Sequence, residues 1–126
     1  MLALGFIFAT LAALVHVFIF YLESFAWEGD KARALFGTTP ESARLTKFNA
    51  YNQGFYNFFL AVLVFAGLIA LIWSRTVGIT LGLAGVVPML AAATVLFVSS
   101  KPHRSAAIKQ GSFPLLATVF LLIAAV

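Results

Sequence analysis

The first apolar stretch of the chain carries two residues that could do chemistry inside a membrane, His16 and Glu23. Residues 2–22 contain no charged residue and are interrupted by this histidine. His16 and Glu23 are about two helical turns apart, so both would lie on one face, separated by about 10 Å along the axis. An ionisable side chain within a membrane span is costly and usually faces a partner or a wet cavity. The pair therefore indicates a polar site in a membrane-spanning helix.

The composition indicates that lipid is the solvent of most of this chain. Of the 126 residues, 63% are hydrophobic and 10% are charged, whereas soluble domains are roughly half apolar and a quarter charged. One domain, residues 1–126, is expected at this length. The absence of cysteine excludes disulfides and thiolate chemistry. The net charge of +4 is small. In a membrane protein such an excess of basic residues usually marks the cytoplasmic connections between spans and not a nucleic-acid partner.

Four apolar segments are long enough to cross a bilayer, which requires about 20 helical residues. They are residues 2–22, 48–73, 76–98 and 105–126. The second helix should begin in water, because Thr39 suits an N-cap and Pro40 suits the first helical position. We therefore predict an all-α integral membrane four-helix bundle, with a polar loop between helices 1 and 2 and a long helix 2 that starts in water.

The basic residues of the connections predict the orientation. Lys and Arg cluster in and beside loops 23–47 and 99–105, and Arg75 is the one basic residue at the opposite connection. Basic connections usually stay in the cytoplasm, so we expect a plasma-membrane protein with both loops inside and both termini outside. The first span should be retained, because no basic residue precedes it as in a signal peptide.

Polar side chains gather in the leaflet that these cytoplasmic helix ends share. Asn49, Gln53 and Asn57 are spaced four apart and form a stripe on helix 2. The candidate ligand-binding residues are His16, Tyr21, Glu23, Asn49, Asn52, Gln53, Tyr56, Asn57 and Gln110. One buried histidine and one glutamate are too few ligands for zinc, so no metal site is expected. His103 lies in a basic loop and is interpreted as a solvated side chain.

Short motifs along the whole chain resemble a family of small bacterial integral membrane proteins, the domain of unknown function 1304. The matching pieces are His16 with Tyr21-Leu22-Glu23, Phe36-Gly37 before Pro40-Glu41, Asn52-Gln53-Gly54 with Tyr56-Asn57, and Lys109-Gln110-Gly111. Val15 is a departure, because many relatives carry an acidic residue before the histidine. The resemblance implies four spans and a membrane location, and it assigns no activity.

Three functions fit these residues. The first is binding or translocation of a small amphipathic molecule or ion in a polar pocket of the cytoplasmic leaflet, with His16 as the protonatable centre and Glu23 as its partner. A transport path would need a homo-oligomer, for which the glycines of the third span, including Gly78 and Gly82, offer a contact between copies.

The second function is that of an intramembrane enzyme acting on a lipid or isoprenoid, with His16 and Glu23 as catalytic acid–base groups. The third is that of a structural subunit whose polar side chains only specify helix packing. No cofactor is expected in any of these cases. The expected partners are the lipid bilayer and a small amphipathic ligand or lipid.

Overall fold

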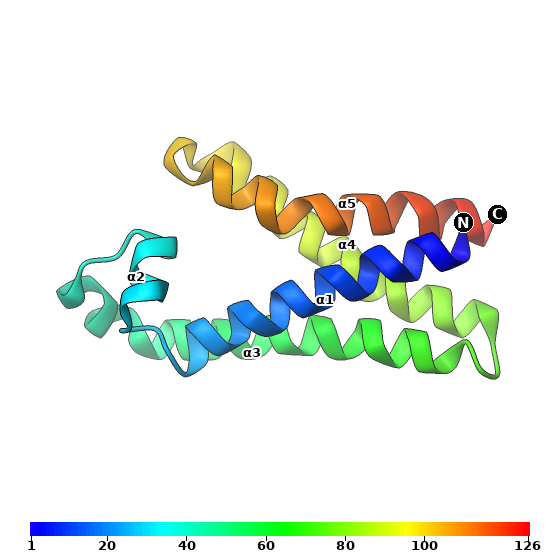
Figure 1. Cartoon of the computed structure of the whole chain (residues 1–126), viewed down its shortest axis with the longest axis horizontal. Helices are drawn as coiled ribbons and strands as arrows, with labels where there is room; N and C mark the ends of the chain where they lie inside the picture. Colours follow the sequence, from blue (N-terminus) through cyan, green and yellow to red (C-terminus); the bar gives the residue numbers. More distant parts are fainter.

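The computed structural model describes all 126 residues and contains helices and the turns that connect them (Figure 1). The long helices are α1 (Leu2–Ser24), α3 (Pro40–Ala70), α4 (Arg75–Ser99) and α5 (Arg104–Ala125). Two short elements are α2 (Asp30–Phe36) and the 3-10 turn η1 (Lys101–His103). The predicted all-α fold class is confirmed, whereas α2 was not expected within the polar loop.

The four helices predicted to cross a membrane are long and apolar enough to do so. The longest, α3, has 31 residues, about 46 Å of helix, and exceeds the roughly 30 Å hydrocarbon core. It begins at Pro40, as predicted, with Thr39 as N-cap. Thr39 Oγ1 accepts from the Ser42 backbone N–H at 3.1 Å, and Ser42 Oγ accepts from the Thr39 N–H at 3.2 Å. This reciprocal capping fixes the start of α3.

The long helices pack so that each has two main neighbours. α1 packs against α3 and α5, and α4 packs against the same two helices from the other side, whereas α1 and α4 hardly touch. The buried core includes Phe6, Val64, Val86, Met89 and Leu121. In Figure 1 both termini lie at one end of the molecule, and the α1–α3 pair diverges from the α4–α5 pair toward the opposite end, where α2 lies.

Close packing of α3 against α4 depends on glycine. A Cβ atom at Gly67 would lie 2.7 Å from the backbone nitrogen of Gly82 and 2.8 Å from the carbonyl oxygen of Gly78, and one at Gly85 would lie 2.9 Å from the Leu60 carbonyl oxygen. The glycine face of the third span is thus covered by the same chain, by α3 and, at Gly82, by Phe6 of α1 and Leu121 of α5. The expectation that it offers a contact between copies is wrong, because the small residues are used within the monomer.

Candidate functional site

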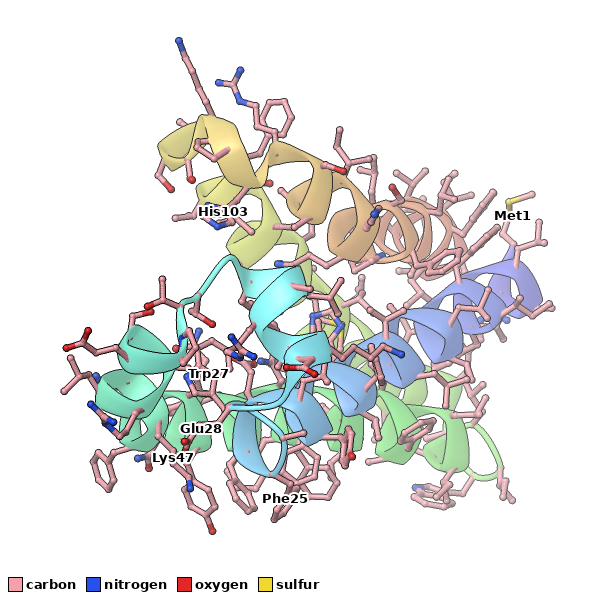
Figure 2. All side chains as sticks on the ribbon, turned by 60° about the vertical axis from the view of Figure 1, so that its left-hand side comes forward. Met1, Phe25, Trp27, Glu28, Lys47 and His103 are labelled. Atoms are coloured by element: carbon pink, nitrogen blue, oxygen red, sulfur yellow. The ribbon has the colours of Figure 1, made fainter.

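A cavity of about 330 Å³ lies at the end where the helix pairs diverge. Its polar lining residues are His16, Glu23, Gln53, Asn57, His103 and Gln110. Its apolar lining residues are Ile19, Leu35, Phe36, Leu60, Met89, Ala92, Leu96 and Ala106. Figure 2 brings this end forward and shows α2 and His103 there. The cavity therefore has walls from every helix and a polar group from α1, α3, η1 and α5.

His16 is buried in α1, with 2% of its surface exposed. Its Nδ1 lies 2.8 Å from the carbonyl oxygen of Ala12, one turn earlier. A carbonyl oxygen can only accept, so this contact assigns the proton of the neutral ring to Nδ1 and leaves Nε2 as an acceptor. The His16 side chain also lines the cavity. The contact with Ala12 fixes the tautomer of the ring, so His16 offers the cavity a hydrogen-bond acceptor, Nε2.

Glu23 is the carboxylate of the site. It is 7% exposed, and its Oε1 accepts a hydrogen bond from Asn57 Nδ2 at 2.5 Å. The same amide group approaches the Gln53 carbonyl oxygen of its own helix at 3.3 Å. The other carboxylate oxygen, Oε2, makes no hydrogen bond or ion pair with the protein. One side of the carboxylate is therefore held by α3, and the other is free to meet a ligand.

Two further carboxamides face the cavity without a partner. The side chains of Gln53 on α3 and Gln110 on α5 line it and make no hydrogen bond within the protein. No lysine or arginine is among the lining residues. The cavity thus combines one carboxylate, two imidazoles and three carboxamides with apolar walls, and it contains no fixed positive charge.

Four residues predicted to bind a ligand do not line the cavity. Tyr21 and Tyr56 are 54% and 72% exposed, and Asn49 and Asn52 are also exposed. The Asn52 amide instead donates to the Phe48 carbonyl oxygen of its own helix at 3.0 Å. Successive i, i+4 positions rotate by about 40° around a helix, so a stripe that faces the cavity at Asn57 has turned away from it at Asn49.

The polar connection contributes apolar walls that the sequence analysis missed. Leu35 and Phe36, at the end of α2, line the cavity. The Phe36 ring lies 5.0 Å from that of Trp27, whose Nε1 donates to Thr46 Oγ1 at 3.1 Å. Gly37 ends α2 with φ of +68°. A glycine directly after an apolar pair is typical of a helix C-terminus, and this signal could have located α2.

His103, interpreted from the sequence as a solvated loop residue, is half-buried and also lines the cavity. The turn η1 directs it inward, and its Nδ1 lies 2.6 Å from Ser100 Oγ. A Cβ atom at Gly37 would lie 3.8 Å from His103 Nε2, so the end of α2 and η1 are neighbours. The histidines and Glu23 do not form a cluster of three metal ligands.

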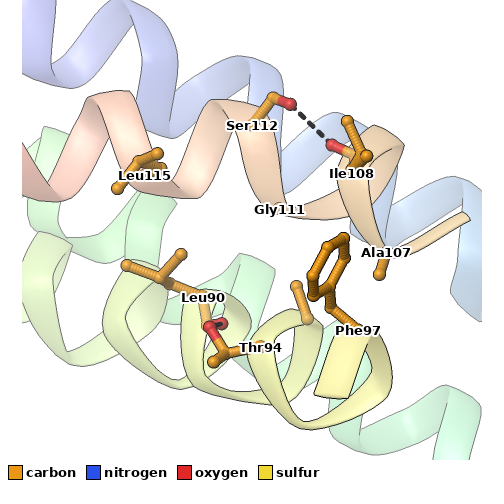
Figure 3. A pocket seen from close by; sticks show the side chains of 9 residues that line it. Leu90, Thr94, Phe97, Ala107, Ile108, Gly111, Ser112 and Leu115 are labelled. Atoms are coloured by element: carbon orange, nitrogen blue, oxygen red, sulfur yellow. Dashed lines mark hydrogen bonds between the residues drawn. The ribbon is translucent and has the colours of Figure 1, made fainter. Parts of the chain in front are cut away.

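A second hollow, of about 300 Å³, lies between α4 and α5 (Figure 3). Its two hydroxyl groups are already used, because Ser112 Oγ donates to the Ile108 carbonyl oxygen at 2.6 Å and Thr94 Oγ1 donates to the Leu90 carbonyl oxygen at 2.8 Å. The remaining lining is apolar apart from the backbone. This hollow offers no free polar side chain, so it does not compete with the first cavity as a polar site.

An all-helical chain with four apolar helices of membrane-spanning length is a membrane protein. Residues 10–122 match the family described as protein of unknown function (DUF1304), and the chain belongs to that family. The resemblance seen in the motifs is thereby confirmed. No curated protein and no solved structure matches the chain. The matched region contains all six polar residues of the cavity.

Proposed function

We propose that this protein binds a small amphipathic molecule in the cavity between its diverging helix pairs, and that binding or passage of this molecule is its function. The observation that supports this most strongly is the convergence of polar groups from α1, α3 and α5 on one space with apolar walls. Small-molecule sites typically occupy about 300–1,000 Å³ and combine apolar walls with few polar groups. A volume of about 330 Å³ lies within that range.

The unpaired side chains argue against a purely structural role. Polar groups that serve only as contacts between helices bond to one another, because hydrocarbon offers no other partner. Asn57 and Glu23 meet this condition. Gln53 and Gln110 do not, since neither side chain bonds within the protein although both line the cavity. Gln53 is exposed, so the half-buried Gln110 is the stronger case of the two. A bound molecule would supply the hydrogen bonds that these amides lack.

The charge distribution supports a cytoplasmic opening. The cavity lies at the end of the four-helix bundle that carries α2 and η1, and these elements bring Lys31, Arg33 and Lys101 to the same end. Basic residues flanking spans mark the cytoplasmic side. We therefore place the cavity in the cytoplasmic leaflet of the plasma membrane, with a ligand entering from the cytoplasm or from that leaflet.

A pair of neighbouring alanines on α4 provides a test of binding. Both alanines are exposed, but Ala92 lines the cavity and Ala91 does not. Native mass spectrometry of the detergent-purified protein should show a co-purifying small molecule in the wild type and in Ala91→Phe. It should be lost in Ala92→Phe, whose ring fills the cavity. Equal retention by both variants would place the molecule elsewhere and contradict the proposal.

A further inference from the structure

We infer that the molecule bound in this cavity is an organic cation, an ammonium group attached to a compact apolar body. The inference rests on the proposed function and specifies its ligand class. It follows from the hydrogen-bonding capacity and the charge of the lining residues, considered together with the absence of basic side chains among them.

The first step concerns α1, which presents acceptors to the cavity. Nδ1 of His16 is committed to the Ala12 carbonyl oxygen, so Nε2 of the neutral ring can only accept. Glu23 accepts from Asn57 through Oε1 and retains Oε2 as a second acceptor. A ligand that satisfies both groups must bring hydrogen-bond donors, and an ammonium group carries donors and no acceptor.

The second step concerns charge. A buried carboxylate without a cation is costly, and no ion pair reaches Glu23. Two basic residues at this end of the molecule are engaged elsewhere, since Arg33 pairs with Asp30 at 2.6 Å and Lys47 pairs with Glu28 at 3.0 Å. Lys31 has no ion pair, and its Nζ lies 5.0 Å from the centroid of the Phe18 ring. A cationic ligand would supply the missing countercharge. An anionic ligand would instead meet the carboxylate with no lysine or arginine to hold it.

The third step concerns the rest of the ligand. Ile19, Leu60, Met89 and Leu96 give the cavity an apolar wall from three of the spanning helices. This surface accommodates hydrocarbon but not a second charge. The side-chain carbonyl oxygens of Gln53 and Gln110 are free and can accept any ammonium hydrogen that His16 and Glu23 do not bind. A single positive head and an apolar body therefore fit the lining as a whole.

Three probes with one carbon skeleton test the charge preference directly: phenylbutylamine, phenylbutanol and phenylbutyrate. Trp27 reports binding, because its ring contacts Phe36, which lines the cavity. The second tryptophan, Trp73, is removed by Trp73→Phe so that the fluorescence has one source. We expect the amine to bind about tenfold or more tightly than the alcohol, and the carboxylate to bind most weakly.

Glu23→Gln should abolish most of the preference for the amine while leaving the alcohol bound, since glutamine keeps the shape and can still accept from Asn57. Glu41→Gln is the matched control, because Glu41 is exposed in the first turn of α3, away from the cavity. The ranking of the three probes in the wild-type protein gives a result even if Glu23→Gln does not fold.

The outcomes separate the two proposals. Equal binding of the three probes, or tighter binding of the carboxylate, overturns the cation inference and leaves a binding cavity. Absence of binding by all three probes, together with absence of a co-purifying molecule, overturns the proposed function. A co-purifying molecule that proves to be neutral or anionic overturns the cation inference alone.

Discussion

Asn57 Nδ2 lies 2.5 Å from Glu23 Oε1, so that an amide of α3 holds the carboxylate at the end of α1. The two residues are 34 positions apart in the sequence, and their contact is an interhelical bond at the rim of the core. It also orients Glu23, because fixing one oxygen directs the other toward the cavity. The same bond thus contributes to helix association and to the shape of the site.

Removing this donor should destabilise the protein. Asn57→Ala leaves a buried carboxylate without its hydrogen bond, which should lower the free energy of unfolding by about 1–2 kcal/mol. Unfolding in mixed micelles, followed by circular dichroism, measures this loss. Asn52→Ala is the control, because Asn52 is exposed and bonds to its own helix. Equal stability of the two variants would show that the interhelical bond contributes nothing.

Gly67→Ala should separate α3 from α4. The added methyl group would lie 2.7 Å from the backbone nitrogen of Gly82, and because that atom is backbone, a whole helix must shift. We expect a net loss of about 1–3 kcal/mol in the free energy of unfolding, despite the better helix propensity of alanine. Ala84→Val adds bulk at an exposed position of α4 and should change little. A Gly67→Ala variant as stable as the wild type would contradict the close contact.

The affinity for an amine should fall as the pH is lowered from about 8 to about 5. The titratable lining groups are His16 and Glu23 of α1 and His103 of η1, and the other helices contribute uncharged side chains. A proton on His16 Nε2 or on Glu23 replaces an acceptor by a donor, while an alkylamine stays protonated throughout, as lysine does. Fluorescence titrations of phenylbutylamine at each pH measure this.

Phenylbutanol is the control for that titration, because its binding does not depend on the carboxylate charge and should vary far less with pH. Amine binding that strengthens at acidic pH would reverse the expected sign. It would contradict the assignment of Glu23 as the countercharge.

The proposed orientation can be measured with single cysteines, because the chain has none of its own. Lys101 and Thr76 are both exposed. Thr76 lies in the first turn of α4, and Lys101 lies in η1, directly after the other end of that helix. In intact cells a membrane-impermeant maleimide should label Thr76→Cys, and it should label Lys101→Cys only after permeabilisation. The reverse pattern would invert the topology and move the cavity to the outer leaflet.

Features that depend on a single helix could be predicted from the sequence. The apolar segments predicted the long helices, and Thr39 with Pro40 located the start of α3, because these signals depend on length and on local capping chemistry. The shared face of His16 and Glu23 follows from helical spacing in the same way, and both side chains are buried at one cavity. Such features need no knowledge of the neighbouring helices.

Features that depend on how helices are rotated and connected were not predictable in the same way. Asn49 and Gln53 have the same spacing signal, but only Gln53 reaches the cavity, since the rotation of α3 is set by packing. The inward position of His103 depends on the turn η1 and on the end of α2 nearby. A linear pattern of polar residues does not contain these contacts between distant segments.

The seven residues of α2 are too few to form a stable helix alone. The position of Leu35 and Phe36 in the cavity wall therefore depends on the contacts of α2 with its neighbouring segments. Those contacts lie outside the packed region around Val64 and Leu121. We therefore expect substitutions in α2 to alter how quickly the proposed ligand exchanges with the cavity, without altering the thermal stability of the four long helices. Under the proposed function, the residence time of the ligand and the thermal stability of the protein would depend on different segments of the chain.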